Sequence, residues 1–215
     1  MDENRKENKK VAIEARDVSV RYGEATIFHD VSFDVFAGEI FVILGASGCG
    51  KSTLMKQMIG LEHPVAGSIR IHGSNVVEAF GSERLSILRR IGVMYQNGAL
   101  FGSMTLTENI LLPLEEFTDY DEEKRMLIAR MKLSLVGLAD YGRHLPSEIS
   151  GGMQKRAAIA RAMALDPSIL FLDEPSAGLD PITSSGLDQL IIRLSKTLGV
   201  TFVVVTHELP SIYTI

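Results

Sequence analysis

The stretch IFVILGASGCGKST, residues 40–53, carries the strongest structural signal in this chain. Five apolar residues open it, and such a run is typical of a strand buried on both faces of a parallel sheet. A glycine-rich turn follows, in which four residues separate Gly45 from Gly50, Lys51 and Ser52. The order of strand, glycine turn and helix predicts a phosphate-binding loop at the carboxyl end of a buried strand.

The residue types of this loop suit a bound polyphosphate. Glycines let backbone N–H groups curl around phosphate oxygens, and the helix N-terminus adds partial positive charge. Lys51 can neutralise the β and γ oxygens, and the Ser52 hydroxyl can ligate a bridging Mg²⁺ ion. A purely structural glycine turn is the alternative, which the strand and helix context disfavours. The candidate phosphate-binding residues are Gly45, Ala46, Ser47, Gly48, Cys49, Gly50, Lys51, Ser52 and Thr53.

A second candidate site lies in SILFLDEP, residues 168–175. Asp173 ends an apolar strand, where a carboxylate can hold Mg²⁺, and Glu174 stands where a base could orient a hydrolytic water. Adjacent carboxylates are also common on solvated surfaces, so the acid pair alone leaves both interpretations open. The phosphate-binding loop in the same chain favours the catalytic one.

Apolar runs and helical patterns alternate along most of the chain, which predicts an α/β fold with a mainly parallel sheet. The early runs alternate apolar with polar residues and predict an N-terminal antiparallel β subdomain. Little strand signal lies between about residues 105 and 165, so we expect an inserted α-helical subdomain there. Buried strands are expected at residues 40–44, 169–172 and 202–205. Helices are expected at residues 52–59, 122–136, 152–164 and 183–198.

Composition narrows the function classes. The chain has 215 residues, of which 46% are hydrophobic, and a net charge of −5, which argues against nucleic-acid binding through a broad basic surface. The single cysteine, Cys49, excludes an intramolecular disulfide and suits a reducing compartment. We expect residues 1–10 to be a flexible tail without a secretory signal, and residues 11–215 to form one domain. No run of about 18 apolar residues occurs, so a membrane role needs a partner.

These motifs, with four more, resemble the nucleotide-binding subunit of ABC transporters, from about residue 11 onward. YQNGALF, residues 95–101, resembles the family's Q-loop, and ISGGMQKR, residues 149–156, is similar to its signature. LDEP and the following SAGLDP resemble its Walker B motif and D-loop, and VVVTHE, residues 203–208, resembles its H-loop. The resemblance implies a P-loop NTPase core that binds ATP and Mg²⁺ and hydrolyses ATP to power a membrane transporter.

The resemblance also implies roles for residues outside the phosphate loop. Tyr22 matches the aromatic residue that stacks on adenine, with an ordinary strand tyrosine as the alternative. Gln96 would approach Mg²⁺ and the attacking water, and His207 would contact the γ-phosphate. The implied catalytic residues are Glu174, His207, Gln96 and Lys51, and the implied metal ligands are Ser52, Gln96 and Asp173.

The signature turn has a different implied role. Ser150, Gly151 and Gly152 would cap the nucleotide held by the other subunit of a head-to-tail homodimer, and Asp180 would lie at the subunit boundary. The sequence departs from the family's usual signature, because Ile149 replaces Leu and Met153 replaces Gln. The hydroxyl and both glycines are intact, so we expect the nucleotide contact to survive.

The sequences of two longer segments narrow the resemblance to one subfamily. GALFGSMTLTENILLPL, residues 98–114, and DEPSAGLDPITSSGLDQLI, residues 173–191, resemble Mla-type cassettes, which move phospholipids with MCE-domain partners. This implies a bacterial protein at the cytoplasmic face of the inner membrane, bound to a transmembrane permease, with residues 97–114 in the contact groove. Eight residues follow His207, where the family continues with another strand, so we expect the C-terminal end of the family domain to be absent.

Three other functions explain the sequence less well. A soluble ABC-type ATPase of DNA repair or translation is disfavoured, because the gap between the two glycine turns is too short for a coiled coil and the chain has one cassette. A P-loop kinase or GTPase does not explain SGGM before FLDEP. A nucleotide-sensing regulatory subunit without turnover is disfavoured, because the chain has a residue for each catalytic role that the resemblance implies.

Overall fold

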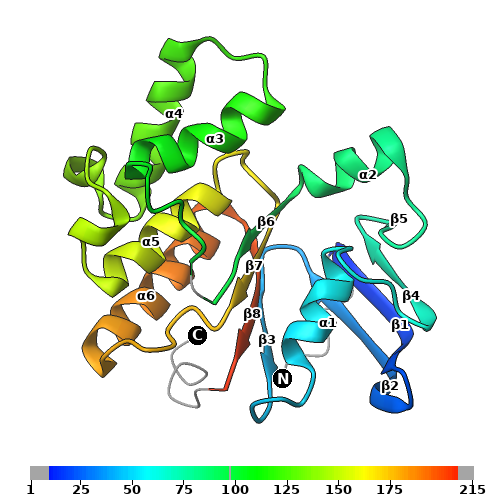
Figure 1. Ribbon diagram of the computed structural model, residues 1–215. Coiled ribbons are helices and arrows are strands. Elements are labelled where there is room, and N and C mark those ends of the chain that lie inside the picture. Colours follow the sequence, from blue (N-terminus) through cyan, green and yellow to red (C-terminus); the bar gives the residue numbers. More distant parts are fainter. Residues whose placement is uncertain (1–9, 97, 208–215) are drawn as a thin grey trace.

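We describe a computed structural model, which covers residues 10–96 and 98–207 (Figure 1). Residues 1–9 of the expected tail, residue 97 and residues 208–215 lie outside the described residues. Two four-stranded sheets form the frame, one antiparallel and one parallel. The expected fold class, an α/β chain with an N-terminal antiparallel sheet and a parallel sheet, is confirmed.

The antiparallel sheet has the strand order β2-β1-β4-β5. Its strands are β1 Val11–Tyr22, β2 Ala25–Phe36, β4 Ala66–Ile71 and β5 Ser74–Asn75. In β1, buried and exposed positions alternate only in part, because the strand pairs on both sides and one face packs on the core. Its apolar-polar pattern therefore predicted the correct kind of strand.

The parallel sheet has the strand order β3-β8-β7-β6. Its strands are β3 Ile40–Leu44, β6 Ile91–Met94, β7 Ile169–Asp173 and β8 Thr201–Thr206. Every residue of β7 and β8 is buried, as their continuous apolar runs predict. For β3 that prediction is wrong. It is an outer strand of the described sheet, so its residues are half-buried and Leu44 is 48% exposed.

Helices cover both faces of the parallel sheet. The helices are α1 Lys51–Met58, α2 Gly81–Leu88, α3 Leu106–Phe117, α4 Glu122–Leu135, α5 Gly151–Ala162 and α6 Pro181–Leu198, with short 3-10 turns at Ala139–Tyr141 and Pro146–Glu148. All four expected helices are present with ends shifted by up to two residues, whereas α2 and α3 were not predicted. The segment between β6 and β7 contains helices α3 to α5, in the region where we expected the helical subdomain. Its limits at about residues 105 and 165 stay a prediction.

The central strands divide the hydrophobic core into two clusters. In β7, Leu170 and Leu172 pack with α5, α6 and the α3–α4 pair, whereas Ile169 and Phe171 face α1 and the antiparallel sheet. In Figure 1, α5 and α6 accordingly lie on one side of the parallel sheet and α1 on the other. Among the described residues, no helix combines the length and apolar character that crossing a bilayer requires.

Candidate functional site

The strand register brings the predicted catalytic residues to one edge of the parallel sheet. Leu44 pairs with Thr206, Asp173 with Val205, and Met94 with Leu172. The four parallel strands therefore end at nearly the same level. The residues that follow these ends are the phosphate loop after β3, Gln96 after β6, Glu174 after β7 and His207 after β8. Segments far apart in sequence thus meet at the carboxyl edge, where open α/β sheets bind ligands.

The glycine loop after β3 begins α1 without a side-chain cap. Gly50 is the N-cap in a left-handed conformation, φ 97°, and an added Cβ would come within 2.6 Å of Ile27. Only glycine suits this position. Because no side chain caps the helix, its first N–H groups are available to an anion. The Lys51 ammonium lies inside the loop and donates to the carbonyls of Gly45 at 2.8 Å and Ala46 at 3.0 Å.

The loop and the first acid are in direct contact. Ser52 Oγ donates to Asp173 Oδ1 at 3.2 Å, across the gap between α1 and β7. Burial raises the pKa of the Asp173 carboxyl, and the Ser52 hydrogen bond partly opposes that rise. A hydroxyl and a carboxylate, both hard oxygen donors, are the ligands that Mg²⁺ prefers, so this pair fits the ion.

Glu174 is held in an uncommon backbone conformation. Its φ is 46°, and its N–H donates to Val205 O at 2.8 Å, which ties it to β8. Its side chain is 14% exposed, and Oε2 lies 2.8 Å from Nδ1 of His207. Positive φ at a non-glycine residue costs energy and persists where the surrounding structure enforces it. The conformation places the carboxylate beside His207, the geometry expected of a base and the group that orients it.

The Q-loop candidate is held by two cations of α5 that sequence reasoning missed. Lys155 Nζ donates to the backbone carbonyl of Gln96, and Arg161 donates to those of Gly98 at 3.1 Å and Ala99 at 2.7 Å. Burial lowers the pKa of Lys155, and the negative charges of Glu174 and Asp173 oppose that change. Lys155 therefore lies within electrostatic reach of both acids, although nothing in its local sequence indicates this.

The signature turn begins a helix in the other layer. Ser150 is the N-cap of α5, and its Oγ accepts the N–H of Met153 at 3.3 Å. A Cβ on Gly152 would lie 2.4 Å from a methyl of Thr183, so this glycine permits close packing of α5 on α6. Asp180 caps α6 and accepts from the hydroxyl of Thr183, which holds the pKa of Asp180 low. Gly152 and Asp180, both predicted site residues, therefore both lie close to Thr183.

Tyr22 reaches the phosphate-loop helix from the antiparallel sheet. It ends β1, its side chain is half exposed, and its hydroxyl donates to the carboxylate of Glu62 in the loop after α1. The structure places it near Thr53 in the first turn of α1. Its assignment to the adenine site stays a prediction.

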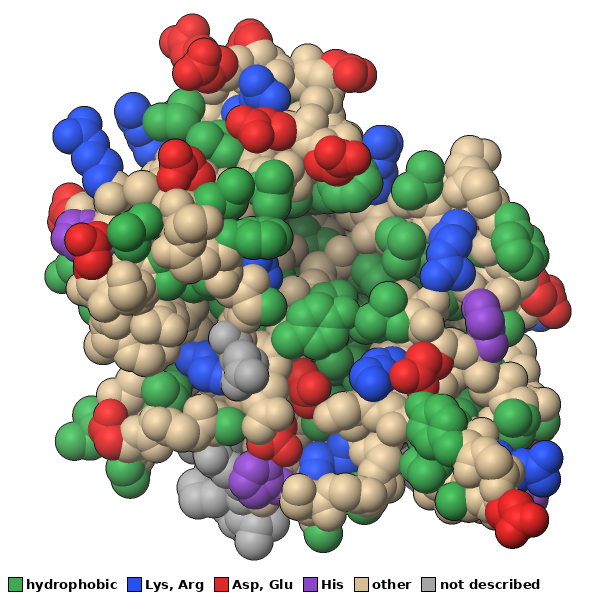
Figure 2. All heavy atoms as spheres, viewed as in Figure 1, with side chains coloured by type: hydrophobic (Ala, Val, Ile, Leu, Met, Phe, Trp, Pro, Cys, Tyr) green, Lys and Arg blue, Asp and Glu red, His purple; other side chains and the backbone are tan. Residues whose placement is uncertain are grey.

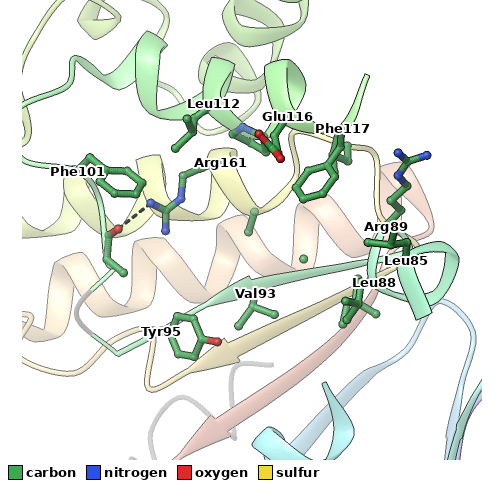
Figure 3. Close-up of a pocket in the computed structure, with 16 residues that line it drawn as sticks. Leu85, Leu88, Arg89, Val93, Tyr95, Phe101, Leu112, Glu116, Phe117 and Arg161 are labelled. Atoms are coloured by element: carbon green, nitrogen blue, oxygen red, sulfur yellow. Dashed lines mark hydrogen bonds between the residues drawn. The ribbon is translucent and has the colours of Figure 1, made fainter. Parts of the chain in front are cut away.

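A groove of about 700 Å³ opens between α2 with β6 on one side and α3 with α5 on the other (Figure 3). Hydrophobic side chains line the hollow on this face of the molecule, as Figure 2 shows. Residues of the predicted contact segment that line it are Ala99, Phe101, Leu112 and Pro113. Asn97, the first residue of the predicted contact segment, lies outside the described residues. The opposite wall, which was not predicted, comes from α2, β6 and the residue after β6. It includes Leu85, Leu88, Val93 and Tyr95.

Comparison with known proteins gives concordant matches. The family model described as ABC transporter matches residues 28–177. The "Probable ribonucleotide transport ATP-binding protein mkl" of Mycobacterium leprae is 45% identical over 198 residues, which are 92% of this chain and 57% of that protein. This chain thus spans little more than half the length of that relative. The intermembrane phospholipid transport system ATP-binding protein MlaF of Escherichia coli K12 is 40% identical over 94% of this chain and 76% of its own length.

A solved structure agrees with the fold. The ATP-binding cassette MJ0796, in a dimeric post-hydrolysis state bound to ADP and Pi, superposes with a TM-score of 0.83 and 31% identity. The match covers 94% of this chain and 90% of that one. Because the family model covers more than half of the chain, and MlaF is matched over most of its length, the chain belongs to the ABC transporter family.

Proposed function

We propose that this chain binds Mg²⁺ and ATP, hydrolyses ATP, and powers a transmembrane transporter. The observation that carries the proposal is the meeting of three groups at one sheet edge: the uncapped phosphate loop, the Ser52–Asp173 contact and the Glu174–His207 pair. The family and the MJ0796 complex with ADP and Pi support the same reaction.

Hydrolysis requires attack of water on the γ-phosphorus, cleavage of the bond to the leaving ADP oxygen, and removal of a proton from the water. Glu174 would orient the water and accept that proton, and His207, 2.8 Å from the carboxylate, would hold it in place. Lys51, which is 7% exposed, would bind the β and γ oxygens. Mg²⁺ held by Ser52, Asp173 and Gln96 would neutralise phosphate charge.

Within one chain the signature turn and the phosphate loop begin helices of different layers. The phosphate loop and α1 lie on one face of the parallel sheet, whereas Ser150 begins a helix on the other face. We infer that the turn contacts the nucleotide of a second copy, so that two chains enclose two nucleotides head to tail. The dimeric state of MJ0796 supports this arrangement.

The groove beside α3 is the proposed seat of the permease. Its apolar lining suits a partner segment that buries hydrophobic side chains, and Arg161 joins its wall to the Q-loop carbonyls. Occupation of the groove would thereby act on Gln96. The proposed location is the cytoplasmic face of a bacterial inner membrane, without a nucleic-acid partner.

For the cargo we propose phospholipid or another hydrophobic molecule, with an MCE-domain protein as an additional partner. The MlaF match supports phospholipid, whereas the name of the mkl protein specifies ribonucleotides. The permease should be purified through this chain from the native host and its bound molecules identified by mass spectrometry. Bound phospholipid supports the proposal, and a ribonucleotide, sugar or drug in its place would reject the cargo assignment.

The same complex tests catalysis and docking. We expect phosphate release to stop when EDTA removes Mg²⁺ and to return when Mg²⁺ is added. Leu85→Glu in the groove should abolish recovery of the permease without reducing ATP binding, because it places a charge in an apolar contact. Leu127→Glu on α4, another exposed leucine outside the groove, is the matched control. Metal-independent hydrolysis would contradict the proposed reaction, and equal permease recovery by both variants would contradict the docking site.

A further inference from the structure

The candidate adenine-stacking residue has a tether that the family resemblance does not include. Tyr22 projects from the end of β1 with half of its surface exposed, so packing alone does not hold its ring. Its hydroxyl donates to a carboxylate oxygen of Glu62, a residue 40 positions later in the chain. This contact joins the antiparallel sheet to the loop that follows α1.

The same carboxylate is also bound to α1. Lys56 Nζ lies 3.3 Å from Glu62 Oε1, and Gln57 Nε2 donates to Oε2 at 3.3 Å. Helix α1 begins at Lys51 in the phosphate loop. One carboxylate therefore connects the tyrosine ring to the helix whose N-terminus receives the phosphates.

The protonation states suit a strong hydrogen bond. The Tyr22 hydrogen bond holds the pKa of the Glu62 carboxyl below its ordinary value, so Glu62 is charged at neutral pH. Glu62 in turn raises the pKa of the Tyr22 phenol, which keeps its proton. Hydrogen bonds between a neutral donor and a charged acceptor are stronger than neutral ones.

We infer that Glu62 is a positioning residue for nucleotide recognition, which holds the Tyr22 ring at a set separation from the phosphate loop so that the site favours nucleotides over bare polyphosphate. The inference rests on the proposed ATP site. It requires that Glu62 affect only the part of the affinity that comes from the base, because the hydrogen bonds of its side chain go to Tyr22 and to Lys56 and Gln57 of α1. A stability role alone would affect every ligand of the site equally.

The test compares two ligands of the full chain by calorimetry, ATP and inorganic tripolyphosphate, both with Mg²⁺. We expect Glu62→Gln to weaken ATP binding about fivefold, the net contribution typical of one hydrogen bond, and to leave tripolyphosphate binding unchanged. Tyr22→Phe keeps the ring and should have the same effect. The double variant should bind ATP no more weakly than either single one, because both changes remove one contact. Glu24→Gln, an exposed charge in the β1–β2 turn, is the matched control.

Each contrary result has a distinct meaning. Two results would overturn the inference without contradicting the proposed function. One is an equal loss of ATP and tripolyphosphate affinity in Glu62→Gln, and the other is additive losses in the double variant. Full ATP affinity in Tyr22→Ala would remove the stacking role and the inference with it. A parent chain that binds neither ligand would reject the proposed function itself.

A spectroscopic measurement checks the same contact without nucleotide. Tyrosinate absorbance is followed against pH in the parent chain and in Glu62→Gln, and the Tyr22→Phe spectrum assigns the Tyr22 component. Because Glu62 raises the pKa of Tyr22, that component should ionise at lower pH in Glu62→Gln. An unchanged Tyr22 titration would show that the carboxylate does not hold the ring, and would overturn the inference.

Discussion

The two glycine-rich turns of this chain both begin helices, but only the second provides a side-chain cap for its helix. At α1 the N-cap is Gly50, which supplies no side-chain acceptor, so the first backbone N–H groups are left for a ligand. At α5 the Ser150 side chain accepts the N–H of Met153 and caps the helix internally. The first turn therefore leaves backbone donors for the proposed phosphate, whereas Ser150 Oγ accepts in the cap and retains its own proton for the proposed contact with a second nucleotide.

The turns also differ in their place in the fold. Helix α1 packs in the cluster shared with the antiparallel sheet, and α5 packs in the cluster of α3, α4 and α6 on the opposite face of the parallel sheet. Two similar sequence patterns thus occupy separate layers. The difference supports two ligands, one held by the chain itself and one held by a second copy.

The largest expected effect is on ATP turnover, when the proposed base is removed and both turns stay bound to unhydrolysed ATP. We expect Glu174→Gln to slow ATP turnover about a hundredfold or more, because it removes the proposed base, while ATP binding persists. The variant should form an ATP-dependent dimer, measured by analytical ultracentrifugation, and turnover should be measured in the permease complex. Glu123→Gln on α4 is the charge-matched control. Turnover at the parent rate would remove Glu174 from the catalytic role.

The second prediction removes the charge from the first turn. Lys51→Ala should weaken ATP binding about tenfold or more, because the loop loses its buried cation and a charge-assisted contact to the phosphates. Calorimetry measures this directly, with the exposed Lys196→Ala as control. Undiminished ATP affinity would contradict assignment of the first turn to phosphate.

The third prediction separates capping from phosphate contact at the second turn. Ser150→Ala in the Glu174→Gln background should weaken ATP-driven dimerisation about fivefold, the net contribution typical of one hydrogen bond, with monomer ATP binding unchanged. It should also lower the unfolding free energy by about 1 kcal/mol through loss of the cap. Ser150→Asp keeps a capping oxygen and should preserve stability, while its charge repels phosphate and abolishes the dimer. Equal losses of dimerisation and monomer binding would mean that the turn serves its own chain.

The smallest expected effect is on kcat, and it comes from the contact between Lys155 of α5 and the carbonyl of Gln96. Lys155→Met should lower kcat about threefold with little change in KM, because Gln96 loses the cation on its carbonyl. Lys155→Arg should restore most of the rate, since it retains a charged donor. Phosphate release by the permease complex gives both constants. A change in KM alone would place Lys155 in ATP binding and not in the positioning of Gln96.

The sequence predicted the parts of the site whose chemistry is contiguous in the chain. The phosphate loop and the Asp173–Glu174 pair each lie within a few residues, so residue type and spacing reveal them. Helix α3 was missed, since Pro113 interrupts its pattern, although Thr105 and Glu108 form a capping box that the sequence could have revealed.

Two sets of contacts between distant segments were not predicted. The cations on the Q-loop carbonyls and the Glu62 carboxylate on Tyr22 join residues about 40 to 60 positions apart. A backbone carbonyl has no signature in the sequence, and a surface glutamate resembles any other. Such contacts depend on how the loops are folded against one another.

The sequence by itself determined that the chain has a P-loop fold with a glycine-rich loop and an acid pair, because glycine spacing and buried-strand patterns are local properties. Only the tertiary structure decided that β3 is an outer strand of the described sheet, that the two glycine turns lie in different layers, and that Lys155 and Glu62 contact residues of the candidate site. Strand order and layer arise from packing between side chains far apart in sequence. No local pattern specifies which of those distant surfaces will meet.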